Sequence, residues 1–227
     1  LNGSVFTVNG AGQGYLAQKI NQPIRGAKTA KLTIEPTTGL LNIAAAPETG
    51  NLIEGAINLR GNEPYLEKSQ IVDDVMIYDL RSDNSVEANI PSNLNRYAWN
   101  LNLSPDIPMS LQLKMAAGEI HLDASQLNVT GVDLNVAVGA ATMTLSGERA
   151  LNGKVRNAVG SLTLFVPPGA ALKVNYKGAL STIIVPPGYL RTADSYSSPN
   201  YAGSSQRIEL DVNQSIGTFT VREQTGR

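Results

Sequence analysis

The chain has 227 residues, no cysteine and a formal net charge of −1 from 18 basic and 19 acidic residues. The balanced charge, without long runs of either sign, argues against nucleic acid, which needs a basic patch, and against a polybasic membrane contact. The lack of cysteine excludes disulfides, thiolate metal sites and a cysteine nucleophile, and no apolar run is long enough to span a bilayer as a helix.

The first 25 residues are polar and rich in glycine, and we expect residues 1–25 to form a tether. From residue 26 to about 105, short runs alternate between apolar and polar residues, as in the segment that contains Trp99, Leu101 and Leu103. Such alternation indicates strands with one buried and one wet face. No segment shows a sustained 3.6-residue apolar period, so we expect almost no helix.

The stretch from about residue 106 to 223 repeats one small unit. A glycine opens each copy, and the successive spacings are 21, 21, 18 and 39 residues, with 39 close to two periods; the glycines are Gly118, Gly139, Gly160, Gly178 and Gly217. A period near 20 residues is typical of a solenoid. Glycine at a fixed position of the unit indicates a corner, where positive φ is accessible at low cost.

The register within the unit strengthens this interpretation. The second and fourth residues after each glycine are mostly apolar, with Met143 and Leu164 as examples, and the residues between them are mostly Thr or Ser. Stacking such strands gives one sheet with a continuous apolar interior. We expect the register to slip near Gly178, where Thr182 stands at an inward position. The prediction is an all-β solenoid with coils of about 20 residues, forming a single domain over residues 26–223 with halves at about 26–105 and 106–223.

Two stretches carry a family resemblance. The run from Ile107 to Asp123 (Ile-Pro-Met-Ser-Leu-Gln-Leu-Lys-Met-Ala-Ala-Gly-Glu-Ile-His-Leu-Asp) and the run from Leu134 to Leu145 (Leu-Asn-Val-Ala-Val-Gly-Ala-Ala-Thr-Met-Thr-Leu) resemble the toast-rack family of bacterial envelope proteins. The C-terminal half is similar to LiaF-type cell-wall-active antibiotic response proteins and to proteins named as adhesins. The resemblance covers about residues 25–223. It implies a single-stranded, right-handed β-helix-like solenoid and brings no catalytic residue and no cofactor.

Residues that could support chemistry have a simpler explanation in each case. His121, the sole histidine, lies at an outward position beside Glu119 and Asp123, which is typical of a solvated strand surface. Asp73 and Asp74 are adjacent on a strand and would face opposite ways. A set of four carboxylates could line neighbouring coils, as in carbohydrate-cleaving β-helices: Asp106, Glu119, Asp123 and Asp133. We predict no catalytic, metal-binding or cofactor-binding residue.

The family resemblance implies a non-enzymatic, extracytoplasmic module for sensing, scaffolding or adhesion through protein–protein contacts. The alternative is a polysaccharide-binding or polysaccharide-cleaving β-helix protein. We expect a membrane-bound or envelope protein as partner, or self-association through the solenoid ends, and an anchor in an N-terminal segment that precedes this chain. The C-terminal coil, a Thr ladder and the polar insertion at residues 195–206 give the candidate interaction residues: Tyr196, Tyr201, Ser204, Arg222, Thr142 and Thr163.

Overall fold

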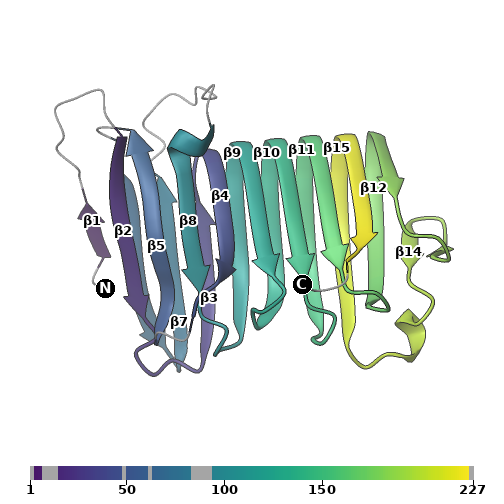
Figure 1. The fold of residues 1–227 in the computed structure, drawn as a ribbon, viewed down its shortest axis with the longest axis horizontal. Coiled ribbons are helices and arrows are strands. Elements are labelled where there is room, and N and C mark those ends of the chain that lie inside the picture. Colours follow the sequence, from purple (N-terminus) through teal and green to yellow (C-terminus); the bar gives the residue numbers. More distant parts are fainter. Residues whose placement is uncertain (1–2, 7–14, 48–49, 61–62, 83–93, 225–227) are drawn as a thin grey trace.

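A computed structural model describes residues 3–6, 15–47, 50–60, 63–82 and 94–224. Strands dominate these residues, and the helical elements among them are two short 3-10 turns, η1 (Leu94–Tyr97) and η2 (Tyr201–Gly203). None of the described helices has the length and apolarity needed to cross a membrane. All strands belong to one 15-stranded sheet, and Figure 1 shows them side by side along the length of the molecule.

The strands fall into short and long groups. The N-terminal strands are short: β1 (Gly3–Phe6), β2 (Tyr15–Pro23), β3 (Thr29–Glu35), β4 (Thr38–Ala45), β5 (Asn51–Arg60), β6 (Tyr65–Val72), β7 (Val75–Ser82) and β8 (Ala98–Leu103). Five later strands are about twice as long: β9 (Met109–Ala124), β10 (Val129–Leu145), β11 (Leu151–Val166), β12 (Ala171–Ile184) and β15 (Arg207–Glu223). Two short strands, β13 (Leu190–Arg191) and β14 (Ser195–Ser197), lie between β12 and β15 in the chain.

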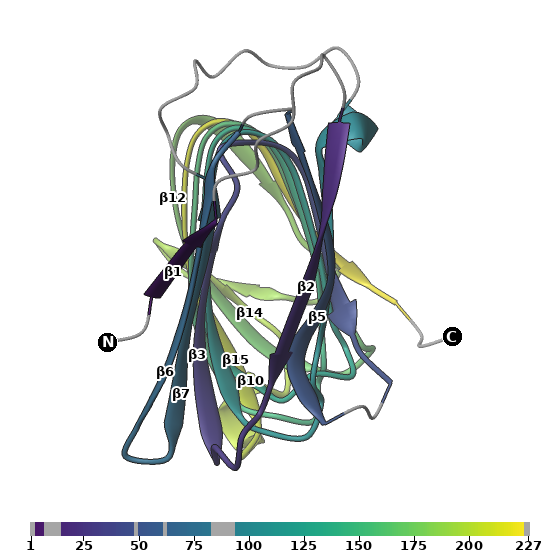
Figure 2. The same ribbon diagram turned by 90° about the vertical axis from the view of Figure 1, so that its left-hand side faces the viewer.

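Each long strand bends over and contributes to two layers. The halves before the bend join β3, β7 and β6 in a first layer, and the halves after it join β4, β8, β5 and β2 in a second layer. Figure 2 shows the bends along the top of the molecule, with the two layers facing each other below them. The expected all-β, β-helix-like solenoid is therefore confirmed.

The bends occur at the corner glycines, and these glycines stack in register. Gly39, Gly118, Gly139, Gly160 and Gly217 occupy equivalent positions on five neighbouring strands. Their φ angles lie between +118° and +146°, a region that residues with a Cβ atom rarely adopt. A Cβ atom on Gly139 would also overlap the carbonyl oxygen of Gly118, so the close stacking of the corners needs glycine in every turn.

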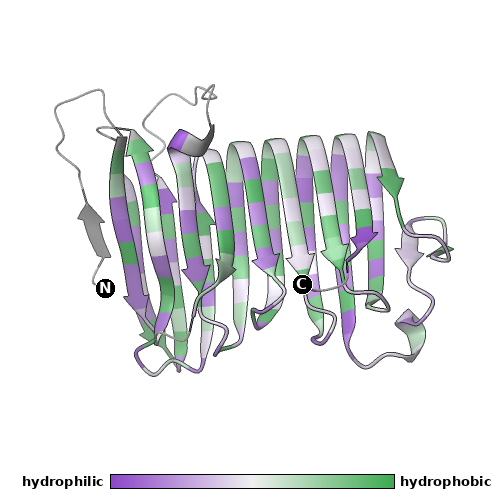
Figure 3. Cartoon of the chain, in the orientation of Figure 1, coloured by the Kyte–Doolittle hydropathy of each residue, from purple (hydrophilic) through white to green (hydrophobic). Residues whose placement is uncertain are grey.

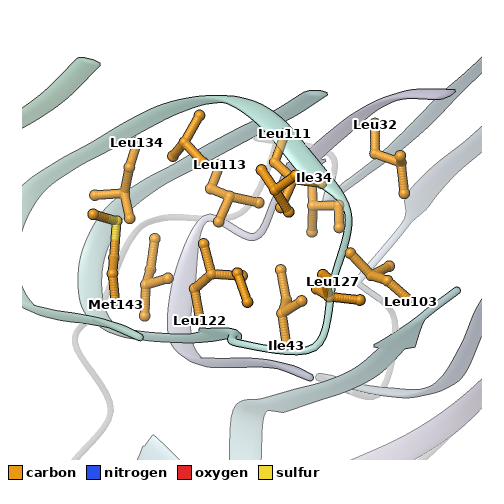
Figure 4. Packing of buried hydrophobic residues seen from close by; sticks show 14 of the residues in the cluster. Leu32, Ile34, Ile43, Leu103, Leu111, Leu113, Leu122, Leu127, Leu134 and Met143 are labelled. Atoms are coloured by element: carbon orange, nitrogen blue, oxygen red, sulfur yellow. The ribbon is translucent and has the colours of Figure 1, made fainter. Parts of the chain in front are cut away.

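Apolar side chains from both layers fill the space between them. Figure 4 shows residues such as Leu113 and Leu122, from the two halves of β9, pointing into this core. Hydrophilic and hydrophobic residues alternate along the long strands (Figure 3). The predicted register is confirmed, because Met143 and Leu164 are buried whereas Thr142 and Thr163 are partly exposed.

The strand order corrects one expectation. The C-terminal coil was expected to end the solenoid, but β15 lies between β11 and β12, and β12 is the last long strand. The corner explains this order, because β15 carries Gly217 in register with Gly160, whereas β12 has Ser181 at that position. Ser181 is not among the described residues with positive φ, so β12 ends the row of long strands without the corner conformation of the others. The same shift confirms the slip near Gly178, and it places Ile184 rather than Ser181 next to Thr220.

Two buried amides support the corners at this end of the core. Asn157 and Gln214 are adjacent in register and almost fully buried. The Asn157 amide nitrogen donates to the carbonyl oxygens of Val136 and Gly139, both at 3.3 Å. The Gln214 amide nitrogen donates to the Gly160 carbonyl at 2.9 Å. Each amide thus satisfies a carbonyl at the corner of the preceding strand, as buried polar groups require.

Two N-terminal predictions also need correction. Residues 1–25 were expected to form a tether, but β2 pairs with β5 along its length and Ile20 is fully buried, so this part belongs to the sheet. The part of the tether prediction that concerns residues 7–14 lies outside the described residues. Asp73 and Asp74 are not strand residues: they form the two-residue turn between β6 and β7, both with positive φ, a conformation that Asp tolerates better than most residues.

Candidate functional site

A shallow groove of about 690 Å³ crosses the outer surface of the first layer. Its walls come from outward-facing residues on six neighbouring strands, β7, β3, β9, β10, β11 and β15. Register aligns these residues in two rows. The first row is Ile77, Lys31, Ser110, Gly131, Asn152 and Glu209, and the second row is Asp79, Thr33, Gln112, Asp133, Lys154 and Asp211.

Small residues make the floor of the groove. Ser110, Gly131 and Asn152 are neighbours in the first row. Gly131 does not have the positive φ of the corner glycines, and a Cβ atom there would meet its nearest neighbours at 3.6 and 3.7 Å. The backbone thus tolerates a side chain at Gly131, and the missing side chain leaves space above the sheet instead.

The groove carries charges of both signs. Arg81 contacts Asp79 at 2.8 Å and Glu35 at 3.6 Å, and Arg156 contacts Asp133 at 2.8 Å. Among the described residues, Lys31 and Lys154 line the groove without an ion pair. Lys154 lies in register between Asp133 and Asp211. These two ammonium groups remain available to an acidic ligand.

A hydrogen-bonded cluster lies beside one end of the groove. Glu209 lines the groove and accepts hydrogen bonds from Lys173 and Asn175, each at 3.2 Å, and from the Tyr201 hydroxyl at 3.1 Å. The Tyr201 ring also contacts two cations, with Lys173 at 6.0 Å and Arg207 at 5.4 Å from its centroid. These contacts hold the η2 turn against the first layer.

The same contacts change two ionisation equilibria. Partial burial opposes ionisation of Glu209, but the hydrogen bonds from Asn175, Lys173 and Tyr201 outweigh it and hold the pKa of that carboxyl below its usual range. Burial, together with the hydrogen bond to Glu209, raises the pKa of Tyr201. Glu209 is therefore ionised and Tyr201 neutral at neutral pH, which is the state that the hydrogen bond needs.

The predicted interaction residues do not form one surface. Tyr201 and Ser204 lie at the groove end, where the Ser204 hydroxyl donates to the carbonyl of Gln206 at 2.9 Å. Tyr196 is opposite Val174 in the β12–β14 pair, and Arg191 lies over its ring at 5.5 Å. The other three residues lie on the outer face of the second layer, on the other side of the core: Thr142, Thr163 and Arg222.

The second layer does contain the predicted Thr ladder. Thr142, Thr163 and Thr220 are consecutive in register, with His121 and Asn42 continuing the row. His121 lies 3.4 Å from Glu119, and Asp123 accepts hydrogen bonds from Ser125 instead. Arg222 is adjacent to Phe165. A hollow of about 270 Å³ lies at one end of this row, with Asn42 and His121 among the residues that line it.

The structure separates the four carboxylates considered for carbohydrate cleavage. Asp133 is on the outer surface of the first layer, whereas Glu119 and Asp123 are on that of the second, and Asp106 lies in the loop before β9, where it contacts Ser104. They cannot act on one glycosidic bond from opposite sides of the core. Within the described ranges, no group of three or more His, Cys, Asp or Glu side chains could hold a metal ion.

Sequence reasoning missed the groove itself. Part of the groove could have been found from the sequence. The 21-residue spacing aligns the outward residues that precede each corner glycine on β9, β10 and β11. The remaining wall residues come from β3, β7 and β15, whose positions beside β9 and β11 have no counterpart in the spacing.

Comparison with known proteins assigns the family. Residues 11–165 match the family described as the N-terminal domain of toast_rack, DUF2154. The chain belongs to the toast-rack family. The match includes residues 11–25, which agrees with β2 being part of the toast-rack sheet. No curated protein sequence is significantly similar to this toast-rack chain.

Two solved structures are similar to this toast-rack protein. The structure of a candidate cell adhesion protein from Clostridium sporogenes has a TM-score of 0.77 and 20% identity, and the match covers 93% of this chain and 100% of that one. At that identity the likeness shows a shared fold. A candidate adhesin from Bacteroides fragilis matches over 93% of this chain and 98% of its own, with 10% identity and a TM-score of 0.31.

Proposed function

We propose that this toast-rack protein is a non-enzymatic module of the cell envelope, located outside the cytoplasm, that adheres to or scaffolds another protein through the first-layer groove. The proposal includes a role in sensing and an anchor in a segment that precedes this chain. The supporting observation is the groove: it is shallow and open, it crosses six strands, and charged and amide side chains line it. Such a surface suits an extended polypeptide better than a small substrate, which binds in an enclosed pocket.

The choice of protein over polysaccharide rests on the groove lining. Sugar rings commonly stack on aromatic side chains, and none of the described residues that line the groove is aromatic. The lining instead offers the ammonium groups of Lys31 and Lys154, and Lys154 lies between Asp133 and Asp211. Such a lining complements a chain with charges of both signs. The adhesion role named for the similar Clostridium sporogenes protein is compatible with this proposal.

Photo-crosslinking in intact cells tests the proposal. A photoreactive amino acid replaces Asn152 on the groove floor or Thr163 on the second layer of the full-length protein. We expect Asn152 to yield crosslinked protein adducts, and Thr163 to yield few. Lys154→Glu should reduce the Asn152 adducts about tenfold, equivalent to about 1.4 kcal/mol. Lys19→Glu, at an exposed position on β2 outside the groove, should leave them unchanged.

Three outcomes would count against this function. Adducts that form only at Thr163 would move the binding surface to the second layer. Equal yields at both positions would indicate random collision. Adducts that a glycosidase removes but a protease does not would favour the polysaccharide-binding alternative.

A further inference from the structure

The second half of β12 presents an open edge among the described residues. One side of β12 pairs with β15 from Ala171 to Ile184. On its other side, β14 pairs only with Lys173 to Asn175, and the Tyr176 amide donates to the Asp194 carbonyl. In the described part of the chain no strand covers the remaining edge from Gly178 to Ile184. Figure 1 shows β12 at the end of the row of long strands, away from the N-terminus.

This edge lacks the features that usually prevent strand addition. Edge strands of natural proteins are protected by charged residues, proline or bulges. The stretch from Gly178 to Val185 contains no charge and no proline, and Leu180 and Ile184 are 76% and 51% exposed. At the opposite end of the second layer, the edge strand β2 has an exposed Lys19 within the strand. Prolines stand at the end of both edges, Pro23 on β2 and Pro186 and Pro187 after β12.

We infer that the Gly178–Ile184 edge of β12 pairs with the same edge of a second copy of this chain, antiparallel and about a two-fold axis. A two-fold axis brings a segment against itself, so a charged edge would repel its own copy, and this segment carries no charge. Antiparallel pairing also places Lys177 of one copy near the far end of the other segment, away from its own counterpart. The two second layers then continue as one sheet, with outward residues on the same side in both copies.

The size of the contact predicts a weak dimer. A pair of seven-residue strands buries Leu180 and Ile184 and forms a few backbone hydrogen bonds, which is less than the roughly 1,200–2,000 Å² of a standard stable interface. The dimer should therefore form at high protein concentration, or where many copies are held on one surface and effective concentration is high. The edge is separate from the groove, so this inference and the proposed function can fail independently.

Disulfide trapping tests the pairing in the purified chain, which contains no cysteine of its own. The outward positions of the edge are Leu180, Thr182 and Ile184. Single variants Leu180→Cys and Thr182→Cys place thiols at two of them, and Thr163→Cys is the control on the same outer face. When the whole segment pairs with itself antiparallel, residue 180 of one copy lies opposite residue 182 of the other, so we expect a disulfide between these positions when the two variants are mixed and oxidised at high concentration. That disulfide should exceed the Thr163→Cys dimer at least tenfold. Adding Ile184→Lys to both variants should abolish it, because a lysine on an edge strand opposes strand addition.

The other results would overturn the inference. No disulfide above the control yield would show that the edge does not pair with itself. A disulfide between the Ile184→Cys variant and a Lys19→Cys variant would show that β12 of one copy pairs with β2 of another, in a head-to-tail stack. Equal yields at all positions would show random collision, and a strand of another protein captured at the edge in place of the second copy would show a different partner.

Discussion

Replacing Gly139 by alanine should destabilise the protein by about 3 kcal/mol or more, since the new Cβ atom would adopt a φ near +137° and overlap the Gly118 carbonyl. The corners stack directly on one another, so a local shift at Gly139 would displace Gly118 and Gly160 as well. Chemical denaturation of the variant measures the change in the free energy of unfolding. We expect loss of folded protein at moderate denaturant, or failure to fold.

Gly131→Ala is the matched control on the same strand. Gly131 lies eight residues before Gly139 and has no positive φ, and a methyl group added there would have ordinary contact distances to its neighbours. The expected change in the free energy of unfolding is within about 0.5 kcal/mol. If the two alanine variants were equally stable, the corner geometry would not require glycine.

Replacing Leu164 by alanine should cost about 2–5 kcal/mol, because Leu164 is fully buried between the layers and truncation would leave a cavity. Thr163→Ala, one residue earlier and facing outward, should change the free energy of unfolding by no more than about 0.5 kcal/mol. Denaturant melts of both variants measure the difference. A larger loss for Thr163→Ala than for Leu164→Ala would show that the alternation is out of register by one residue.

The repeat pattern was sufficient to predict the fold. Glycines spaced 21 residues apart are in register on β9, β10 and β11, and the second and fourth residues after them point into the core. This works because strand alternation and a glycine corner are local properties, which a residue and its neighbours determine. The Thr ladder follows from the same register.

Strand order could not be predicted in the same way. The chain order β11, β12, β15 and the spatial order β11, β15, β12 bury the same apolar faces, so alternation does not distinguish them. One signal was present: the fourth residue after Gly178 is Thr182, and the true corner position is Ser181. This segment therefore lacks a glycine at the corner position, and a strand without the corner glycine indicates an end of the sheet.

The groove was missed for a related reason. Its wall residues come from six strands, and only β9, β10 and β11 are adjacent in both chain and space. Glu209 and Asp211 reach the groove because β15 inserts next to β11, and this insertion also brings Tyr201 against Glu209. The candidate site therefore depends on the strand order.

Disulfide formation within a double-cysteine variant tests this strand order, and with it the groove, most directly. Lys154 and Asp211 are in register on β11 and β15, and Asn175 is one strand further away on β12. Because neighbouring strands lie about 4.8 Å apart, cysteines at Lys154 and Asp211 are within disulfide range, whereas cysteines at Lys154 and Asn175 are not. We predict rapid intramolecular oxidation of the Lys154→Cys/Asp211→Cys variant and little oxidation of the Lys154→Cys/Asn175→Cys variant. The reverse result would place β12 beside β11 and remove Asp211 and Glu209 from the groove.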